Sequence, residues 1–210
     1  MMDGEIPKEM KTGTTTVGII SNDAVILAAE RKATMGYLVA TQDAEKVHQL
    51  DTHLGMTIAG VVGDAQSLIR YVKAELKLYE LNEDKKMGIE SASTLMANIL
   101  YSRRFYPYIV QLIVAGYDTK PELFTLSPDG SVMPDKYFST GSGSPMAFGV
   151  LEDEYKDNMT ADEAVRLAVR AVRSATKRDI ASGGSGIDAV VISKSGYKKV
   201  PDEEVRKISQ

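Results

Sequence analysis

Residues 24–29, Ala-Val-Ile-Leu-Ala-Ala, form an apolar run with the length of a strand. A strand that is apolar on both of its faces has to be covered on both sides. The run follows a β-branched segment at 14–20 and the turn signal Asn22-Asp23, so we expect the two segments to pair as a hairpin. The fold should therefore bury this hairpin between two other layers.

The rest of the pattern predicts one α+β domain, with enough strands for two sheets and helices to cover them. No linker or internal repeat divides the 210 residues. Thr160 to Glu163 has the sequence of a capping box, and Ser144 before Pro145 is expected to be an N-cap. Further strands are expected at 46–50, 56–62, 109–115, 122–127 and 187–193, and further helices at 64–81 with Asp64 as N-cap, at 89–104 and from 201 onward.

Composition excludes several classes of protein. The net charge of -4 leaves no broad basic surface for nucleic acid, and no apolar run reaches the roughly 18 residues of a membrane span. Without cysteine the chain has no disulfide, thiolate metal site or cysteine nucleophile. The only two histidines, His48 and His53, disfavour a histidine-based metal site and leave few choices for a Ser-His-Asp triad. We expect them to have pocket or surface roles, and we expect no metal or cofactor.

A short charged leader precedes the first strand. Residues 1–13 contain Asp3, Glu5 and Lys8, which interrupt the apolar stretch that a secretory signal requires. The segment has no periodicity, so it is interpreted as a flexible or removable leader.

The segment Gly13-Thr14-Thr15-Thr16 carries the main chemical hypothesis. A threonine is a poor nucleophile within a chain, but after cleavage of the Gly13–Thr14 bond Thr14 would carry both a hydroxyl and a free α-amine. That amine has a pKa near ~8 and can act as the base for its own hydroxyl. Gly13 offers no side-chain obstruction to attack on its carbonyl. The simpler alternative is three β-branched residues in an edge strand.

Two charged residues are candidates to support Thr14. The predicted hairpin places Glu30 beside the start of the first strand, where its carboxylate can orient the amine and a neighbouring lysine. If Lys46 is buried beside Glu30, its positive charge would lower the pKa of the Thr14 hydroxyl and amine. A solvated strand end at 30–32 and an ordinary surface lysine are the alternatives.

Two glycine-rich loops complete the candidate site. The loop at 139–145 leads into a helix, so it could bind an anion or allow close backbone approach, although it is neither a Walker A loop nor a dinucleotide fingerprint. In the second loop, at 178–184, Asp179 and Ser182 could reach Ser142. The two glycines that end the second loop could also be plain C-cap residues of the preceding helix.

Five stretches in order resemble the proteasome β subunits of the archaeal type, and the resemblance covers essentially residues 12–208. Each stretch is weak alone, but five in order along a chain of this length are highly specific. They are Thr-Gly-Thr-Thr-Thr-Val-Gly at 12–18, Glu-Arg-Lys at 30–32, Gly-Val-Val-Gly-Asp-Ala-Gln at 60–66, Ser-Thr-Gly-Ser-Gly-Ser-Pro at 139–145 and Arg-Asp-Ile-Ala-Ser-Gly-Gly at 178–184.

The resemblance implies a four-layer αββα sandwich of the N-terminal-nucleophile hydrolase type. It implies that 1–13 is a propeptide removed autocatalytically and that 14–210 is a single catalytic domain. Glu30 stands where many relatives have Asp, and Lys32 where relatives often have Arg. Matched by position, the catalytic residues are Thr14 as nucleophile, Glu30 and Lys46 as the charged pair, the Gly60 N–H as oxyanion donor, and Ser142, Asp179 and Ser182 as a supporting network; the substrate-binding residues are Ala33, Thr34, Ala44, Ile58 and Val62.

The same resemblance implies the activity and its setting. The expected activity is that of a threonine endopeptidase that degrades unfolded proteins and, because its pocket walls are apolar, prefers hydrophobic side chains before the cut. The expected partners are proteasome α subunits and other β subunits, in four stacked seven-membered rings fed by an unfolding ATPase. The expected location is the cytoplasm, without nucleic acid or membrane partners.

Three alternatives are considered. A non-catalytic ring subunit would lack the threonine after Gly13 or the Glu30/Lys46 pair, and this chain has all three. Another amidohydrolase of the same fold, or a simpler two-ring bacterial relative, is disfavoured by the stretch at 178–184 and by the chain length. A phosphate-binding module built on 141–144 would be stabilised by phosphate and would be unaffected by Thr14→Ala.

Overall fold

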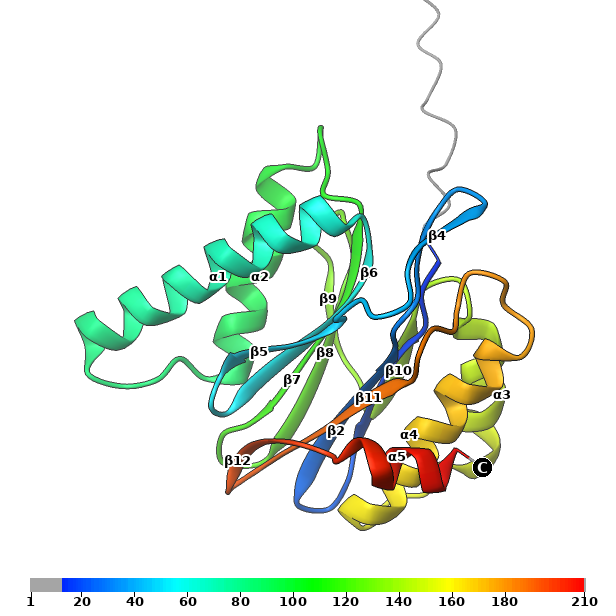
Figure 1. The fold of residues 1–210 in the computed structure, drawn as a ribbon. Coiled ribbons are helices and arrows are strands. Elements are labelled where there is room, and N and C mark those ends of the chain that lie inside the picture. The colour runs from blue at the N-terminus through cyan, green and yellow to red at the C-terminus, as the bar shows by residue number, and fades with distance from the viewer. Residues whose placement is uncertain (1–12, 210) are drawn as a thin grey trace, which may run out of the picture.

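Residues 13–209 are described in a computed structural model, so the predicted propeptide lies outside the described residues except for Gly13. Strands and helices follow one another in the predicted order of strands, two helices, strands, two helices and strands, with a short helix at the end (Figure 1). The α+β prediction is confirmed.

The first sheet consists of β1 (Thr16–Ile20), β2 (Ala24–Glu30), β10 (Tyr137–Thr140), β11 (Ile187–Ser193) and β12 (Gly196–Lys199). Its order is β10-β1-β2-β11-β12, and every neighbouring pair is antiparallel. All seven residues of the central strand β2 are buried, as its apolar run predicts. The predicted hairpin is confirmed, because Thr16 pairs with Ala29 and so brings the end of β2 to the start of β1.

The second sheet consists of β5 (Val47–Asp51), β6 (Leu54–Gly60), β7 (Val110–Tyr117), β8 (Pro121–Leu126) and β9 (Val132–Pro134), in that order. The predicted strand at 56–62 is shifted, because Gly60 has a φ of 143° and closes β6. A separate hairpin of β3 (Ala33–Met35) and β4 (Leu38–Thr41) was not predicted, since its exposed residues show no alternation.

Five helices are described: α1 (Val62–Glu83), α2 (Ile89–Ser102), α3 (Ser144–Glu154), α4 (Ala161–Thr176) and α5 (Asp202–Ile208). The capping box at α4 is confirmed, because Thr160 and Glu163 bond each other's backbone N–H groups. Between residues 13 and 209, no helix combines the length and the apolar character needed to cross a membrane.

Two predicted N-caps are wrong. Asp64 lies in the first turn of α1, where Val61 is the N-cap, and its carboxylate instead accepts a hydrogen bond from the Ile109 N–H at 2.9 Å. The N-cap of α3 is Gly143, so Ser144 is already the first helical residue and makes no capping bond. The helices therefore begin earlier than the side-chain signals predict, with the N-cap three residues earlier at α1 and one residue earlier at α3.

Three apolar clusters hold the layers together. One joins α1 and α2 to the second sheet and includes Leu68 and Met96. Another joins α3, α4 and α5 to the first sheet. The third, which includes Leu27 and Ile113, contains residues of both sheets and therefore lies between them. Figure 1 shows α1 and α2 on one side of the strands and α3, α4 and α5 on the other.

A buried group of hydroxyls also ties the two sheets together. The Thr16 hydroxyl hydrogen-bonds Thr57 of β6 at 2.9 Å and Thr140 of β10 at 2.7 Å. All three side chains are buried, so these bonds satisfy polar groups that would otherwise be costly between apolar layers. They fix the start of β1 against both sheets, next to the predicted nucleophile.

Candidate active site

Thr14 is buried at the entrance to β1, with only 4% of its surface exposed. Its hydroxyl donates to the Gly13 carbonyl oxygen at 2.6 Å, and its backbone N–H donates to the Ser142 hydroxyl at 3.3 Å. The hydroxyl thus already contacts the carbonyl group that precedes it.

Gly13 is at a position with no room for a side chain. A Cβ atom placed there would lie 1.6 Å from the Cβ of Ala181. The Gly13 N–H donates to the Thr34 hydroxyl at 3.3 Å, which ties the residue to β3. Glycine at 13 therefore lets the 178–184 loop pack directly on the bond before Thr14.

The Glu30 carboxylate lies at the end of β2 and is buried. One oxygen accepts from the Thr15 N–H at 3.1 Å and from the Lys46 ammonium; the other accepts from the N–H groups of Lys32 at 2.7 Å and Gly183 at 2.9 Å. This environment is not a solvated strand end. Three backbone donors and one cation fix the carboxylate in a single position.

Lys46 is buried immediately before β5. Its ammonium pairs with Glu30 and also donates to the Lys32 carbonyl at 2.6 Å. Burial lowers the pKa of Lys46 below its usual 10.5, and the neighbouring Glu30 carboxylate opposes this shift. Lys46 is therefore not an ordinary surface lysine.

A chain of hydroxyls leads from Thr14 to Asp179. Ser142 donates to one Asp179 carboxylate oxygen at 2.5 Å, and Ser182 donates to the same oxygen at 2.6 Å. The Thr15 hydroxyl lies 2.6 Å from Ser182. Since the Ser182 proton is used on Asp179, Thr15 is the donor of that bond. The predicted contact between Ser142, Asp179 and Ser182 is confirmed, but the part of Thr15 was not predicted.

Glycines allow both loops to approach the chain around Thr14. A Cβ at Gly141 would lie 2.1 Å from the Thr14 carbonyl oxygen, and one at Gly143 would lie 2.0 Å from the Thr15 hydroxyl. Close backbone approach thus explains the 139–145 loop. The glycines at 183 and 184 are not C-cap residues, because α4 ends at Thr176 and the Gly183 carbonyl instead accepts from the N–H groups of residues 31 and 32.

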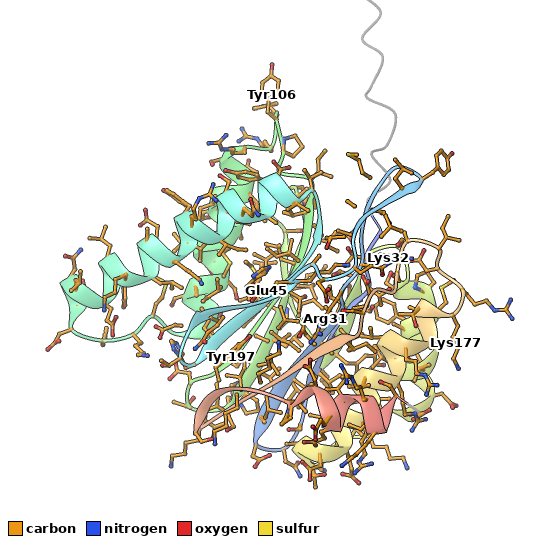
Figure 2. All side chains as sticks on the ribbon, viewed as in Figure 1. Arg31, Lys32, Glu45, Tyr106, Lys177 and Tyr197 are labelled. Carbon is orange, nitrogen blue, oxygen red and sulfur yellow. The ribbon has the colours of Figure 1, made fainter. Side chains whose placement is uncertain are left out.

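Arg31 belongs to a separate ion-pair group beside the site. Its guanidinium binds Asp188 at 2.8 Å and Asp202 at 2.9 Å, and Lys199 adds a second cation to Asp188 at 2.8 Å. Burial alone would raise the pKa of Asp188, but hydrogen bonds from Arg31 and Lys199 hold it below its usual 3.8. Figure 2 labels Arg31 together with Lys32, the neighbouring residue whose carbonyl accepts from Lys46.

A cavity of about 1320 Å³ opens beside Thr14. It extends from Thr14 and Lys46 past the β3–β4 hairpin to the first two turns of α1. Gly60, the predicted oxyanion donor, lies on its wall with no room for a side chain, because a Cβ would be 2.1 Å from the Ile109 carbonyl. Every predicted substrate-binding residue lines the same cavity: Ala33, Thr34, Ala44, Ile58 and Val62.

Part of the cavity wall was not predicted from the sequence. His48, Gln66, Ile69 and Arg70 also line it. The last three follow Val62 at helical spacing along one face of α1, but the sequence does not show what that face meets. His48 thus has a pocket role, whereas His53 bonds the Met87 carbonyl at 2.9 Å and does not line the cavity. Among residues 13–209, no group of three or more His, Cys, Asp or Glu residues is placed to hold a metal ion.

Comparison with known proteins gives the class of this chain. The family description "Proteasome subunit" matches residues 10–192. The chain therefore belongs to the proteasome subunit family.

Individual relatives are similar over nearly their whole length. The protein named proteasome subunit beta of Methanothermobacter thermautotrophicus is 48% identical over 201 residues, covering 95% of this chain and 96% of that protein. The protein of the same name from Thermoplasma acidophilum is 49% identical over 196 residues, covering 93% of each. Proteasome subunit beta 2 of Aeropyrum pernix is 48% identical over 190 residues, covering 90% of this chain and 86% of that protein.

Proposed function

We propose that this chain is the catalytic β subunit of a proteasome core particle and acts as a threonine endopeptidase. The observation that carries the proposal is the position of Thr14, which directly follows a sterically required glycine at the edge of a large cavity and lies between the Glu30–Lys46 pair and the Ser142–Asp179 network. The three apolar clusters support assignment of the fold as a four-layer αββα sandwich of the N-terminal-nucleophile hydrolase type.

Activation is proposed to begin with attack of the Thr14 hydroxyl on the Gly13 carbonyl carbon. The bond from the Gly13 carbonyl carbon to the Thr14 nitrogen breaks, so the Gly13 acyl group moves to the hydroxyl oxygen as an ester. The nitrogen takes up the hydroxyl proton and stays on Thr14 as a free α-amine. Water then hydrolyses the ester and releases residues 1–13. The 2.6 Å contact between the Thr14 hydroxyl and the Gly13 carbonyl supports this step.

Turnover on a substrate repeats the same chemistry between two chains. The Thr14 α-amine, through a water molecule, takes the hydroxyl proton while the oxygen attacks a peptide carbonyl. The Lys46 ammonium lowers the pKa of that hydroxyl by its positive field, and the Gly60 N–H stabilises the oxyanion. The amine of the leaving peptide departs, an acyl-enzyme ester remains on Thr14, and water hydrolyses it.

Ser142, Asp179 and Ser182 are proposed to hold the amine in place. In the uncut chain the Ser142 hydroxyl already accepts the Thr14 N–H, so the same contact can orient the amine after cleavage. The apolar cavity walls formed by Ala33, Ala44 and Ile58 support a preference for hydrophobic side chains before the cut bond.

The family supports the proposed partners. We propose assembly with α subunits and with other β subunits in four stacked seven-membered rings in the cytoplasm, with an unfolding ATPase at the α rings and unfolded polypeptides as substrates. No cofactor is required in this mechanism.

The variant Thr14→Ala tests the proposed function. It lacks the nucleophile for both reactions, so intact-mass analysis should find residues 1–13 still attached, and hydrolysis of fluorogenic peptides should fall to background. A variant with the leader removed and with wild-type hydrolysis would refute the proposal. Thr52→Ala, at an exposed turn that does not line the cavity, is the matched control and should be processed normally.

A further inference from the structure

His48 occupies a position in the cavity that ordinary core packing does not explain. It lies two residues after Lys46, so both side chains project from the same face of the strand. A strand rises about 3.3 Å per residue, which places His48 about 7 Å along the chain from Lys46. Thr14 and His48 thus line the same cavity, with Lys46 beside both of them.

The ring nitrogens of His48 are available for a ligand. Within the described part of the chain no hydrogen bond joins the imidazole to another residue, and its nearest ionic neighbour is the Glu45 carboxylate, 4.0 Å from Nδ1. The His48 side chain is 17% exposed, and neither of its ring nitrogens is among the buried polar atoms without a partner, so both open into the cavity. A substrate group that enters the cavity can supply the missing hydrogen bond.

Burial favours the neutral form of the imidazole. Burial lowers the pKa of His48 below 6.5, Glu45 opposes this shift, and Lys73 of α1 adds to it. Arg70 also faces the cavity from α1. Met56 of β6 pairs with His48 in the sheet; it is fully buried and carries no charge. A neutral imidazole can either donate or accept one hydrogen bond.

Part of the cavity wall is formed by small and aliphatic side chains. Ala33 and Ala44 have small side chains, and Ile58 pairs with the strand position of Lys46, since its N–H donates to the Lys46 carbonyl at 3.1 Å. An aromatic ring can occupy this space and direct its far edge toward His48. The hydroxyl of a tyrosine there could hydrogen-bond the His48 imidazole. In a purely apolar pocket the same hydroxyl would have no partner.

We propose that His48 is a specificity-determining residue that selects tyrosine over phenylalanine immediately before the cut bond. This inference rests on the proposed function and narrows its hydrophobic preference to an aromatic side chain with a polar tip. Phenylalanine fills the same space but leaves the imidazole unpaired, whereas tyrosine pairs with it. One net hydrogen bond corresponds to a preference of about five- to tenfold in kcat/KM.

The test uses fluorogenic peptides that differ only in the residue before the cut, which is Tyr, Phe, Leu or Glu. The processed, assembled protein is assayed, and each rate is expressed relative to Phe so that differences in active-site concentration cancel. For wild type we expect a Tyr-to-Phe ratio of rates of about five to ten. For His48→Phe this ratio should fall to within about twofold of one. His48→Gln keeps a polar tip and should retain most of the wild-type ratio. Gln49→Ala, on the opposite exposed face of the same strand, should not change it.

A wild-type ratio near one, a dominant preference for Glu, or an unchanged ratio in His48→Phe would each overturn the inference. The wild-type ratio alone decides the matter if a variant fails to assemble. Failure of the proposed function has a different signature, because peptide hydrolysis would then persist in Thr14→Ala whatever the ratio.

Discussion

The buried pair of Glu30 and Lys46 gives the sharpest energetic prediction. Glu30→Gln keeps the shape of the side chain but removes the charge that faces Lys46. It also turns one of two accepting oxygens into an NH₂ group, opposite either the Thr15 N–H and the ammonium or the N–H groups of Lys32 and Gly183. Removing one partner of a buried pair costs about 3–5 kcal/mol, and we expect a loss in this range.

Lys46 limits how much stability Glu30→Gln can lose. Because burial already lowers its pKa, Lys46 can lose its proton when Glu30 is neutral, which avoids an unpaired buried charge. Glu30→Gln should therefore destabilise the protein less at alkaline pH than at pH 7. The folded-state pKa lies below 10.5, so the stability of Glu30→Gln should rise as the pH approaches that value.

A double-mutant cycle with Lys46→Met isolates the pair. The variants are compared by urea unfolding in the Thr14→Ala background, so that every chain is expected to keep its leader. Removing both charges together should cost at least about 2 kcal/mol less than the sum of the two single changes. Single effects that add to within about 0.5 kcal/mol would refute the reasoning, because they would mean that Glu30 and Lys46 do not depend on each other.

Two other predictions concern positions beside the site. Gly13→Ala would put a Cβ 1.6 Å from the Cβ of Ala181, so the scissile bond must shift; processing followed by intact mass should slow about 10²-fold, and an unchanged rate would contradict the steric argument. Asp188 has a lowered folded-state pKa because Arg31 and Lys199 outweigh its burial, so its stabilising contribution is present above pH 3.8 and is lost as the pH falls through the folded pKa. Asp188→Asn should therefore flatten the decline of Tm on the acid side, and a decline as steep as that of wild type would count against this assignment.

The hairpin and its charged end could be predicted because their signals are local. An apolar run, a turn signal and a count of residues were sufficient to bring Glu30 beside the chain at Thr14. The glycines of the two loops were also informative, since close approach excludes any other residue. The geometry of the hairpin and of the glycine loops follows from a few residues that are neighbours in the sequence.

Other parts of the site depend on contacts between distant segments. The Thr15 hydroxyl binds Ser182, which is 167 positions away, and nothing near Thr15 indicates that partner. His48 belongs to the cavity only because α1 lies over its strand. The same limitation explains the error at Asp64, whose carboxylate binds Ile109 from another part of the chain and not its own helix.

The hydroxyl bonds of Thr16 connect the architecture to the chemistry. Burial of apolar surface has no preferred direction, whereas the hydrogen bonds from Thr16 to Thr57 and Thr140 do. They occur at the end of the sheets where the Glu30–Lys46 pair also joins the two halves. The hydroxyl contacts that join the two sheets at this end therefore lie within two residues of Thr14 along the chain, so a substitution at Thr16 would disturb the packing of the sheets and the surroundings of the nucleophile together.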